Sequence, residues 1–228
     1  TYLGLLSNEL SGEIPESVGQ LTNLTSLNLS NNQLTGGIPE SIGNLTNLID
    51  LRLCDNQLTG SIPDEIGNLT QLRKIWLYNN KLTGSIPDEI GNLTQLTLFH
   101  ISSNNFSGGI PPSIENLVNL LYLDLSSIQL TEIPSEIFNL ETLNNLSLYN
   151  NQLSGEIPSE IGNLVNLEIL NLFGNQFTGG IPLEISNLVN LSYLDLSENQ
   201  LSGSPFDILL DLANLDYLYL HVNQFSGY

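Results

Sequence analysis

The chain has 228 residues, with 24 acidic side chains against 4 lysines and arginines, so its formal net charge is −20 at neutral pH. This excess of negative charge argues against binding to nucleic acid or an anionic membrane surface, and it leaves basic partners, divalent cations and uncharged ligands open. The single Cys54 excludes an intramolecular disulfide. The sequence contains no run of about 18 apolar residues, so no membrane span is predicted.

A phrase with the spacing Leu-x-x-Leu-x-x-Leu-x-Leu-x-x-Asn-x-Leu-x-Gly-x-Ile-Pro recurs along the whole chain at a period of 24 residues. A fixed period of this length predicts a solenoid, in which each unit buries its apolar side only against its neighbours. We therefore expect one continuous domain over residues 1–228. After a partial unit at Thr1–Gln20, the units begin at Leu21, Leu45, Leu69, Leu93, Leu117, Leu140, Leu164, Leu188 and Leu212.

The first predicted element of each unit is a short strand. The Leu-x-Leu pairs, such as Leu27/Leu29 and Leu51/Leu53, have the two-residue alternation of a strand with one buried face. Stacking one strand per unit predicts a parallel sheet along one side of the coil. The predicted fold class is an α/β repeat solenoid, a right-handed coil of about ten units with a concave parallel β-sheet.

An asparagine follows each predicted strand, as at Asn32 and Asn56, except where Ile128 replaces it. A buried amide can satisfy the backbone groups that a turn leaves inside the coil, so we predict a structural role for these residues. Next, Gly-x-Ile-Pro combines a residue that permits positive φ with one that fixes φ, which predicts a bend. The closing Ile-Gly-Asn resembles the end of a short helical turn with Gly or Asn in the left-handed conformation.

The segments Leu34-Thr35-Gly36-Gly37-Ile38-Pro39 and Leu58-Thr59-Gly60-Ser61-Ile62-Pro63 resemble the plant-type leucine-rich repeat. Proteins with this repeat include plant receptor ectodomains, polygalacturonase inhibitors, plant ice-binding proteins and secreted microbial repeat proteins. For receptors and inhibitors, the resemblance implies a concave binding sheet and an extracellular or cell-surface location. The chain lacks their paired cap cysteines and any island between repeats, so a microbial surface protein also fits.

Two clusters of unusual side chains fall on the predicted sheet face. The first comes from three consecutive units and comprises Arg52, Arg73, Lys74, Trp76, Tyr78 and His100. Aromatic and Arg side chains often anchor recognition surfaces, which predicts a ligand-binding patch. The alternative is that the basic side chains only offset Asp50 and Asp55 while Trp76 packs flat over the sheet.

The second predicted cluster lies toward the C-terminus and comprises Tyr122, Tyr149, Phe173, Tyr193, Tyr217 and Tyr219, with His221 and with Asp124, Asp195 and Asp216 interspersed. Rings offer stacking faces and carboxylates accept hydrogen bonds, a combination that suits a peptide or carbohydrate ligand. The alternative is ordinary strand composition, because Tyr favours strands.

Two further columns repeat along the chain. An acidic column follows each proline and is expected to be a solvated face; it comprises Glu16, Glu40, Asp64, Glu65, Asp88, Glu89, Glu136, Glu160, Glu184 and Asp207. A hydroxyl column occupies one position of every unit and suits either a local turn or an ice-binding surface. It comprises Ser11, Thr35, Thr59, Thr83, Ser107, Thr131, Ser154, Thr178, Ser202 and Ser226.

The sequence offers no pairing of a nucleophile with a base, because His100 and His221 lie about five repeats apart and Cys54 has no histidine in its own or an adjacent unit. We therefore expect no enzymatic activity, no cofactor and no metal site. Several Asn-x-Ser/Thr sequons, such as Asn44 and Asn68, would make the protein a glycoprotein if it were secreted in a eukaryote.

The favoured function is non-enzymatic recognition of a protein, peptide or glycan on the concave face. The alternatives are a structural or adhesive surface protein, including a filament-forming one, and in third place an ice-binding protein. Both ends of the chain fall inside a repeat, and ends of repeat arrays normally need polar caps. We therefore expect either a segment of a longer protein or end-to-end self-association.

Overall fold

The computed structural model describes residues 1–205 and 212–226. The 24-residue repeats are grouped into two larger compact parts, the first unit (Thr1–Leu120) and the second unit (Leu121–Tyr228). Asp207 of the predicted acidic column lies outside the described residues. The single continuous domain expected from the repeats stays a prediction.

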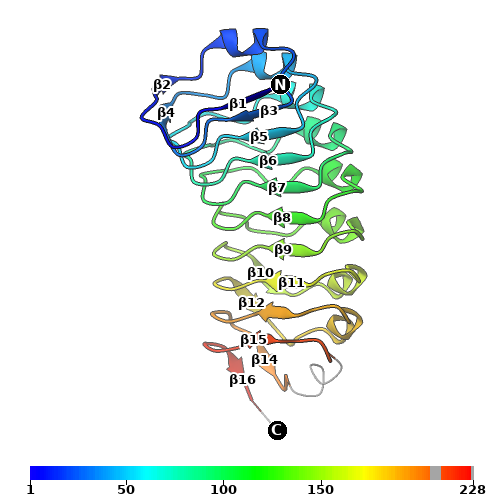
Figure 1. Ribbon diagram of the computed structural model, residues 1–228. Helices are drawn as coiled ribbons and strands as arrows, with labels where there is room; N and C mark the ends of the chain where they lie inside the picture. The colour runs from blue at the N-terminus through cyan, green and yellow to red at the C-terminus, as the bar shows by residue number, and fades with distance from the viewer. Residues whose placement is uncertain (206–211, 227–228) are drawn as a thin grey trace. The chain divides into compact units, whose positions relative to one another are not determined.

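Each unit contains a parallel sheet built from one short strand per repeat (Figure 1). In the first unit the described strands follow the order β1 (Tyr2–Gly4), β3 (Ser26–Asn28), β5 (Asp50–Arg52), β6 (Lys74–Trp76) and β7 (Leu98–His100). In the second the order is β8 (Tyr122–Asp124), β9 (Asn145–Ser147), β11 (Ile169–Asn171), β13 (Tyr193–Asp195) and β15 (Tyr217–Tyr219). The register places Leu27 beside Leu51, and Leu170 beside Leu194. The predicted strands and their parallel pairing are therefore confirmed within each unit.

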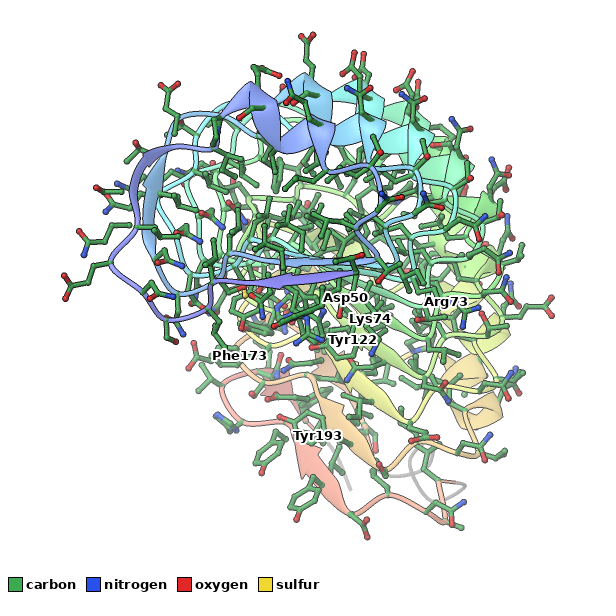
Figure 2. All side chains as sticks on the ribbon, turned by 45° about the horizontal axis from the view of Figure 1, so that its top comes forward. Asp50, Arg73, Lys74, Tyr122, Phe173 and Tyr193 are labelled. Carbon is green, nitrogen blue, oxygen red and sulfur yellow. The ribbon has the colours of Figure 1, made fainter. Side chains whose placement is uncertain are left out.

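Short 3₁₀ helices lie across the coil from the sheet (Figure 2). Each begins directly after a proline with ψ near 145°, such as Pro39 or Pro63, because proline sets the extended entry into the turn. The described helices are η1 (Glu16–Gln20), η2 (Glu40–Asn44), η3 (Asp64–Asn68), η4 (Asp88–Asn92), η5 (Pro112–Asn116), η6 (Ser135–Asn139), η7 (Ser159–Asn163) and η8 (Leu183–Asn187).

Additional two-stranded sheets form at the Leu-Thr-Gly segments, which the sequence pattern did not predict. Among the described residues they pair β2 (Ser11–Glu13) with β4 (Gln33–Thr35), β10 (Ser154–Glu156) with β12 (Gln176–Thr178), and β14 (Ser202–Gly203) with β16 (Gln224–Phe225). Their strands have only two or three residues, and β2, β10 and β14 carry no apolar side chain. Gly36 lies just after β4 with φ of 71°, so the predicted positive φ of this glycine is confirmed.

The core of each unit is a stack of leucines, isoleucines and phenylalanines between the sheet and the 3₁₀ helices. Leu51, Leu53 and Leu58 have no exposed surface, and neither does Leu170 in the second unit. Each repeat contributes the same apolar positions, so the interior continues from one coil to the next within a unit.

The asparagine after each strand has the predicted structural role. Asn56 Nδ2 donates to the carbonyl oxygens of Leu29, Leu53 and Cys54 at 3.0, 3.1 and 3.2 Å, and its Oδ1 accepts from Leu34 N at 3.0 Å. One amide thus joins backbone groups of two successive coils.

At Ile128, where the asparagine is missing, the next asparagine compensates. Asn151 Oδ1 accepts from both Ile128 N at 3.1 Å and Leu130 N at 3.0 Å. Asn151 Nδ2 also donates to Leu125 O at 2.9 Å.

The prediction of a left-handed residue in Ile-Gly-Asn was wrong. Gly43 has no positive φ; instead, a Cβ on Gly43 would lie 2.6 Å from the backbone oxygen of Glu65 in the next helix. The glycine is needed because adjacent 3₁₀ helices pack backbone against side chain. Left-handed φ occurs instead one residue before the asparagine of each repeat, for example at Asn31, Asp55 and Asn79, with φ between 52° and 56°.

Candidate ligand-binding face

The first predicted cluster lies on neighbouring strands of the first unit. The register places Arg52, at the end of β5, beside Trp76, and it places Trp76 beside His100 at the end of β7. Alternation along each strand directs these side chains away from the buried Leu51, Ile75 and Phe99. The strand register alone thus brings the Arg52 guanidinium and the rings of Trp76 and His100 together.

Arg52 is held in place by its own strand. Its Nε lies 3.1 and 3.0 Å from the two carboxylate oxygens of Asp50, and its Nη2 lies 2.7 Å from Asp50 Oδ2. The hydrogen bond with Asp50 raises the pKa of the Arg52 guanidinium, although burial opposes this effect. The guanidinium carbon lies 5.6 Å from the Trp76 ring centroid, within the range of a cation–π contact. Asp50 therefore fixes Arg52 over the indole.

Three rings form a connected aromatic surface beside Arg52. Tyr78 stacks on His100 with centroids 4.3 Å apart and planes at 25°. The Trp76 centroid lies 6.3 Å from that of Tyr78 and 5.8 Å from that of His100. His100 Nε2 lies 2.7 Å from the Ser102 hydroxyl, which sets the orientation of the ring. These contacts make the cluster rigid.

A cavity of about 290 Å³ opens beside this cluster. Its polar wall includes Cys54, whose Sγ lies 3.1 Å from Ser30 Oγ and whose pKa is raised by burial. A hydrogen bond with Cys54, together with burial, raises the pKa of Tyr78, so its phenol stays neutral. Sequence reasoning missed the serine, cysteine and asparagines here because they look like ordinary strand positions. The lining residues are Leu6, Asn28, Ser30, Asn31, Arg52, Cys54, Asp55, Trp76 and Tyr78.

Arg73 and Lys74 occupy a different part of the same face. Lys74 pairs in register with Asp50, and Arg73 precedes β6 on the flank of the sheet, as Figure 2 shows. Both side chains are exposed, and neither lines the cavity. The predicted cluster therefore comprises a rigid part around Trp76 and two exposed bases beside it.

The second predicted cluster is spread over the sheet face of the second unit. The Tyr122 hydroxyl donates to Asp124 Oδ2 at 3.3 Å. Burial, followed by the charge of Asp124, raises the pKa of Tyr122 to about 12 and also raises that of Tyr149. Phe173 is half-buried on the same unit.

The remaining tyrosines of the second cluster form a closer group. The Tyr193 centroid lies 6.1 Å from that of Tyr217 and 5.7 Å from that of Tyr219. Tyr219 meets His221 edge to face at 6.3 Å. The structure thus brings Tyr193, Tyr217 and Tyr219 into ring contact on β13 and β15.

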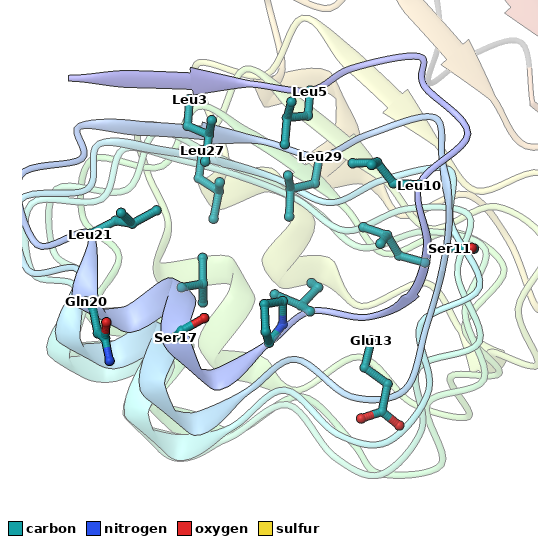
Figure 3. Close-up of a pocket in the computed structure, with 14 residues that line it drawn as sticks. Leu3, Leu5, Leu10, Ser11, Glu13, Ser17, Gln20, Leu21, Leu27 and Leu29 are labelled. Atoms are coloured by element: carbon teal, nitrogen blue, oxygen red, sulfur yellow. The ribbon is translucent and has the colours of Figure 1, made fainter.

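A larger cavity, of about 520 Å³, lies inside the first coil (Figure 3). Half of the residues that line it are leucines, including Leu3, Leu5, Leu27 and Leu29, which lie on the core side of the first two repeats. Small-molecule sites combine an apolar wall with a few convergent polar groups. Such groups converge beside Arg52, so we place the candidate site there.

Comparison with known proteins places the chain in a family. Residues 1–110 and 111–227 match the family model described as a leucine-rich repeat region. The chain therefore belongs to the leucine-rich repeat proteins. The comparison with curated proteins found no match.

Several solved structures are similar over nearly the whole chain. A TDR receptor shares 37% identity with a TM-score of 0.96 over 99% of this chain and 39% of its own. The Arabidopsis receptor kinase HAESA, in complex with the peptide hormone IDA and the co-receptor SERK1, shares 36% identity with a TM-score of 0.80 over 99% of this chain and 46% of its own. A plant ice-binding protein shares 33% identity with a TM-score of 0.85 over 99% of this chain and 73% of its own.

The chain spans less than half the length of the two receptors. The fold class predicted from the repeats, a leucine-rich repeat solenoid of plant type, is confirmed by the family match and these structures. Within the described residues, no helix has the length and apolar character required to cross a membrane.

Proposed function

We propose that this chain is a non-enzymatic recognition module that binds a protein or peptide ligand on the sheet face of its first unit. The observation that carries the proposal is the rigid cluster of Arg52, Trp76, Tyr78 and His100 beside a cavity. Interface anchors are typically aromatic and Arg side chains in preorganised positions, which lose little entropy on binding. HAESA, a similar structure, was solved with a peptide hormone, which supports a peptide as the ligand class.

The indole of Trp76 adds a second line of support. Its Nε1 is buried and has no hydrogen-bond partner among the described residues. A buried indole N–H normally finds an acceptor, so leaving one unmet is costly for a residue that only packs. A small rotation of the ring would present this donor to an acceptor on a ligand.

The test is a selection from linear random peptides against the immobilised protein, followed by titration of the selected peptide. We expect saturable binding that Trp76→Ala weakens at least about tenfold, as is usual for an aromatic anchor. Arg73→Ala should weaken it less, because Arg73 lies on the exposed flank. Lys81→Ala is the matched control, since it removes an exposed positive charge outside the cluster. Lys81 Nζ donates to Gln57 Oε1 at 3.2 Å.

Equal effects of the Trp76 and Lys81 substitutions, with the fold intact by circular dichroism, would remove this patch from consideration. We also propose an extracellular or cell-surface location, in line with the ectodomain setting of similar receptors. Recovery of the native protein only from the cytosol would contradict it.

A second candidate function, ice binding, rests on the hydroxyl column. Thr59 N donates to Gly36 O and Thr83 N donates to Gly60 O, both at 2.8 Å, so a regular backbone ladder spaces the exposed hydroxyls of Thr35, Thr59 and Thr83. Such a ladder repeats at about 4.8 Å. Thermal hysteresis at micromolar protein is the measurement, and its absence together with unchanged ice recrystallisation would dismiss this function.

A further inference from the structure

The charges of the chain are divided unequally between its two units. All four lysines and arginines lie in residues 1–120. Residues 121–228 contain 13 of the 24 acidic side chains and no lysine or arginine. A partner that binds the sheet face of the second unit therefore meets carboxylates that no Lys or Arg of that unit neutralises. Charge complementarity favours a cationic group on that partner.

Asp195, like Asp124, is a nearly buried carboxylate built into this face. It is 9% exposed, and its Oδ1 accepts from the backbone N and the hydroxyl of Ser197 at 2.9 and 2.5 Å. Its Oδ2 accepts from the Tyr193 hydroxyl at 3.4 Å, a long contact. Oδ2 is therefore the oxygen with remaining capacity for a stronger donor.

The fold does not require the negative charge at this position. In other repeats an asparagine does the same structural work: Asn28 Oδ1 accepts from Ser30 N, and Asn171 Oδ1 accepts from Phe173 N, both at 3.1 Å. A buried carboxylate is costlier than a buried amide unless a cation or strong donors compensate it. Because an asparagine supports the same turn elsewhere, the charge of Asp195 is available for a ligand.

Tyrosines lie beside this carboxylate on its own strand and on the neighbouring strand. Tyr219 is the register partner of Asp195 on the neighbouring strand, and Tyr217 is the partner of Tyr193. The Tyr193 ring is tilted by 44° and 50° to the rings of Tyr217 and Tyr219, which are 57% and 38% exposed. Aromatic faces attract an ammonium or guanidinium group, and a nearby carboxylate strengthens the attraction.

We propose that Tyr193, Asp195, Tyr217 and Tyr219 form a pocket for the side chain of a lysine or arginine on a peptide partner. This inference rests on the proposed recognition function and names one feature of peptides that bind the second unit. The rings contact the aliphatic stem and the cation, and Asp195 Oδ2 accepts a hydrogen bond from the cationic head. The binding surface on the second unit is thus specific for a basic residue.

The experiment uses the same selection from linear random peptides, at physiological ionic strength, with the intact chain. We expect the selected peptides to share a Lys or Arg, and replacement of an essential Arg by the uncharged isostere citrulline to weaken binding about tenfold. Asp195→Asn should weaken the Arg peptide by a similar factor and leave the citrulline peptide unchanged. Tyr219→Leu should weaken the Arg peptide as well.

Glu198→Gln is the matched control, because it removes the same charge from an exposed residue of the same repeat. We expect this change to weaken binding less than about twofold, as for an exposed charge at a rim. Equal losses for Asp195→Asn and Glu198→Gln would show general attraction by the acidic chain and would overturn the pocket.

The two proposals fail in different ways. Peptide binding that Trp76→Ala abolishes but Asp195→Asn and citrulline leave unchanged would overturn the pocket and retain the proposed function. Selective binding of neutral oligosaccharides at the tyrosines, insensitive to Asp195→Asn, would overturn the pocket and make that face a glycan site. The absence of saturable binding to any peptide would overturn both proposals.

Discussion

At the scale of single residues, the most informative side chains are those whose polar atoms join successive coils. From Asn32 onward, the repeat asparagines connect their own turns to backbone groups of the coil before, as Asn56 does with Leu29 O and Leu34 N. Such groups lie away from water, so an unmet one costs the full loss of its hydration. The amide is thus a structural requirement of the coil rather than part of the ligand site.

Asn56→Ala is expected to lower the free energy of unfolding by about 3 kcal/mol, because it leaves several buried backbone groups without a partner. Urea denaturation followed by circular dichroism measures this loss. The adjacent exposed Gln57→Ala should change the free energy by no more than about 0.5 kcal/mol. Similar losses for both variants would contradict the structural role of the amide.

The half-buried tyrosines make stability depend on pH in the alkaline range. The pKa of Tyr122 rises from 10.0 to about 12 on folding, because burial and the charge of Asp124 disfavour the phenolate. The native state then keeps a proton that the unfolded chain loses. This contribution to stability is therefore fully present below pH 10.0 and is lost as the pH rises toward about 12.

We expect Tyr122→Phe to reduce the fall in unfolding free energy across this alkaline range. Urea unfolding at a series of pH values measures the slope. Exposed Tyr2, which is 65% exposed, provides the control as Tyr2→Phe. An unchanged slope for Tyr122→Phe would show that its phenol titrates alike in both states.

At the scale of elements, the spacing of the 3₁₀ helices depends on glycine at one position. A Cβ at Gly43 would meet the Glu65 backbone oxygen at 2.6 Å, whereas one at Gly37 meets nothing closer than 3.8 Å. Gly37 also has no positive φ. Two glycines six residues apart therefore differ in what they do for the fold.

Gly43→Ala is expected to destabilise the protein by about 1–3 kcal/mol, since η2 and η3 must move apart. Gly37→Ala should be neutral or slightly stabilising, because it only reduces the freedom of the unfolded chain. Thermal and urea unfolding compare the two variants directly. Equal destabilisation would contradict the specific role of Gly43 in the packing of η2 against η3.

At the scale of the whole molecule, the net charge of −20 controls association. Like charges keep copies of the chain apart at neutral pH, and this repulsion disappears near the isoelectric point of about 4.1. The lysines and arginines are confined to residues 1–120. Attraction between opposite charges on two copies of the chain would therefore involve the first unit.

Light scattering should show reversible self-association with a maximum near pH 4, where the net charge vanishes. Added salt at pH 7 should leave the scattering of the free protein low and slow its association with basic peptides, because salt screens long-range attraction. A scattering maximum near neutral pH would show that another force drives association.

The sequence by itself determined the repeat, the parallel strands, the buried leucines and the role of the asparagines, because each depends on a pattern that recurs at fixed spacing. It also identified Trp76 and Tyr193 as unusual residues on the sheet face. It missed the short strands β2 and β4 and the left-handed residues at Asn31 and Asp55, because these arise from hydrogen bonds between coils. The reason for Gly43 was likewise invisible, since it lies in the distance to Glu65 on the next helix.

Only the tertiary structure decided which of the unusual residues act together. It joined Arg52 to Asp50 and Trp76, separated Arg73 from the cavity, and placed Tyr193 in contact with Tyr217 and Tyr219. The physical reason is that a repeat specifies which face a side chain occupies. The contacts that a side chain makes across strands depend on its rotation and on the residues that neighbouring coils present.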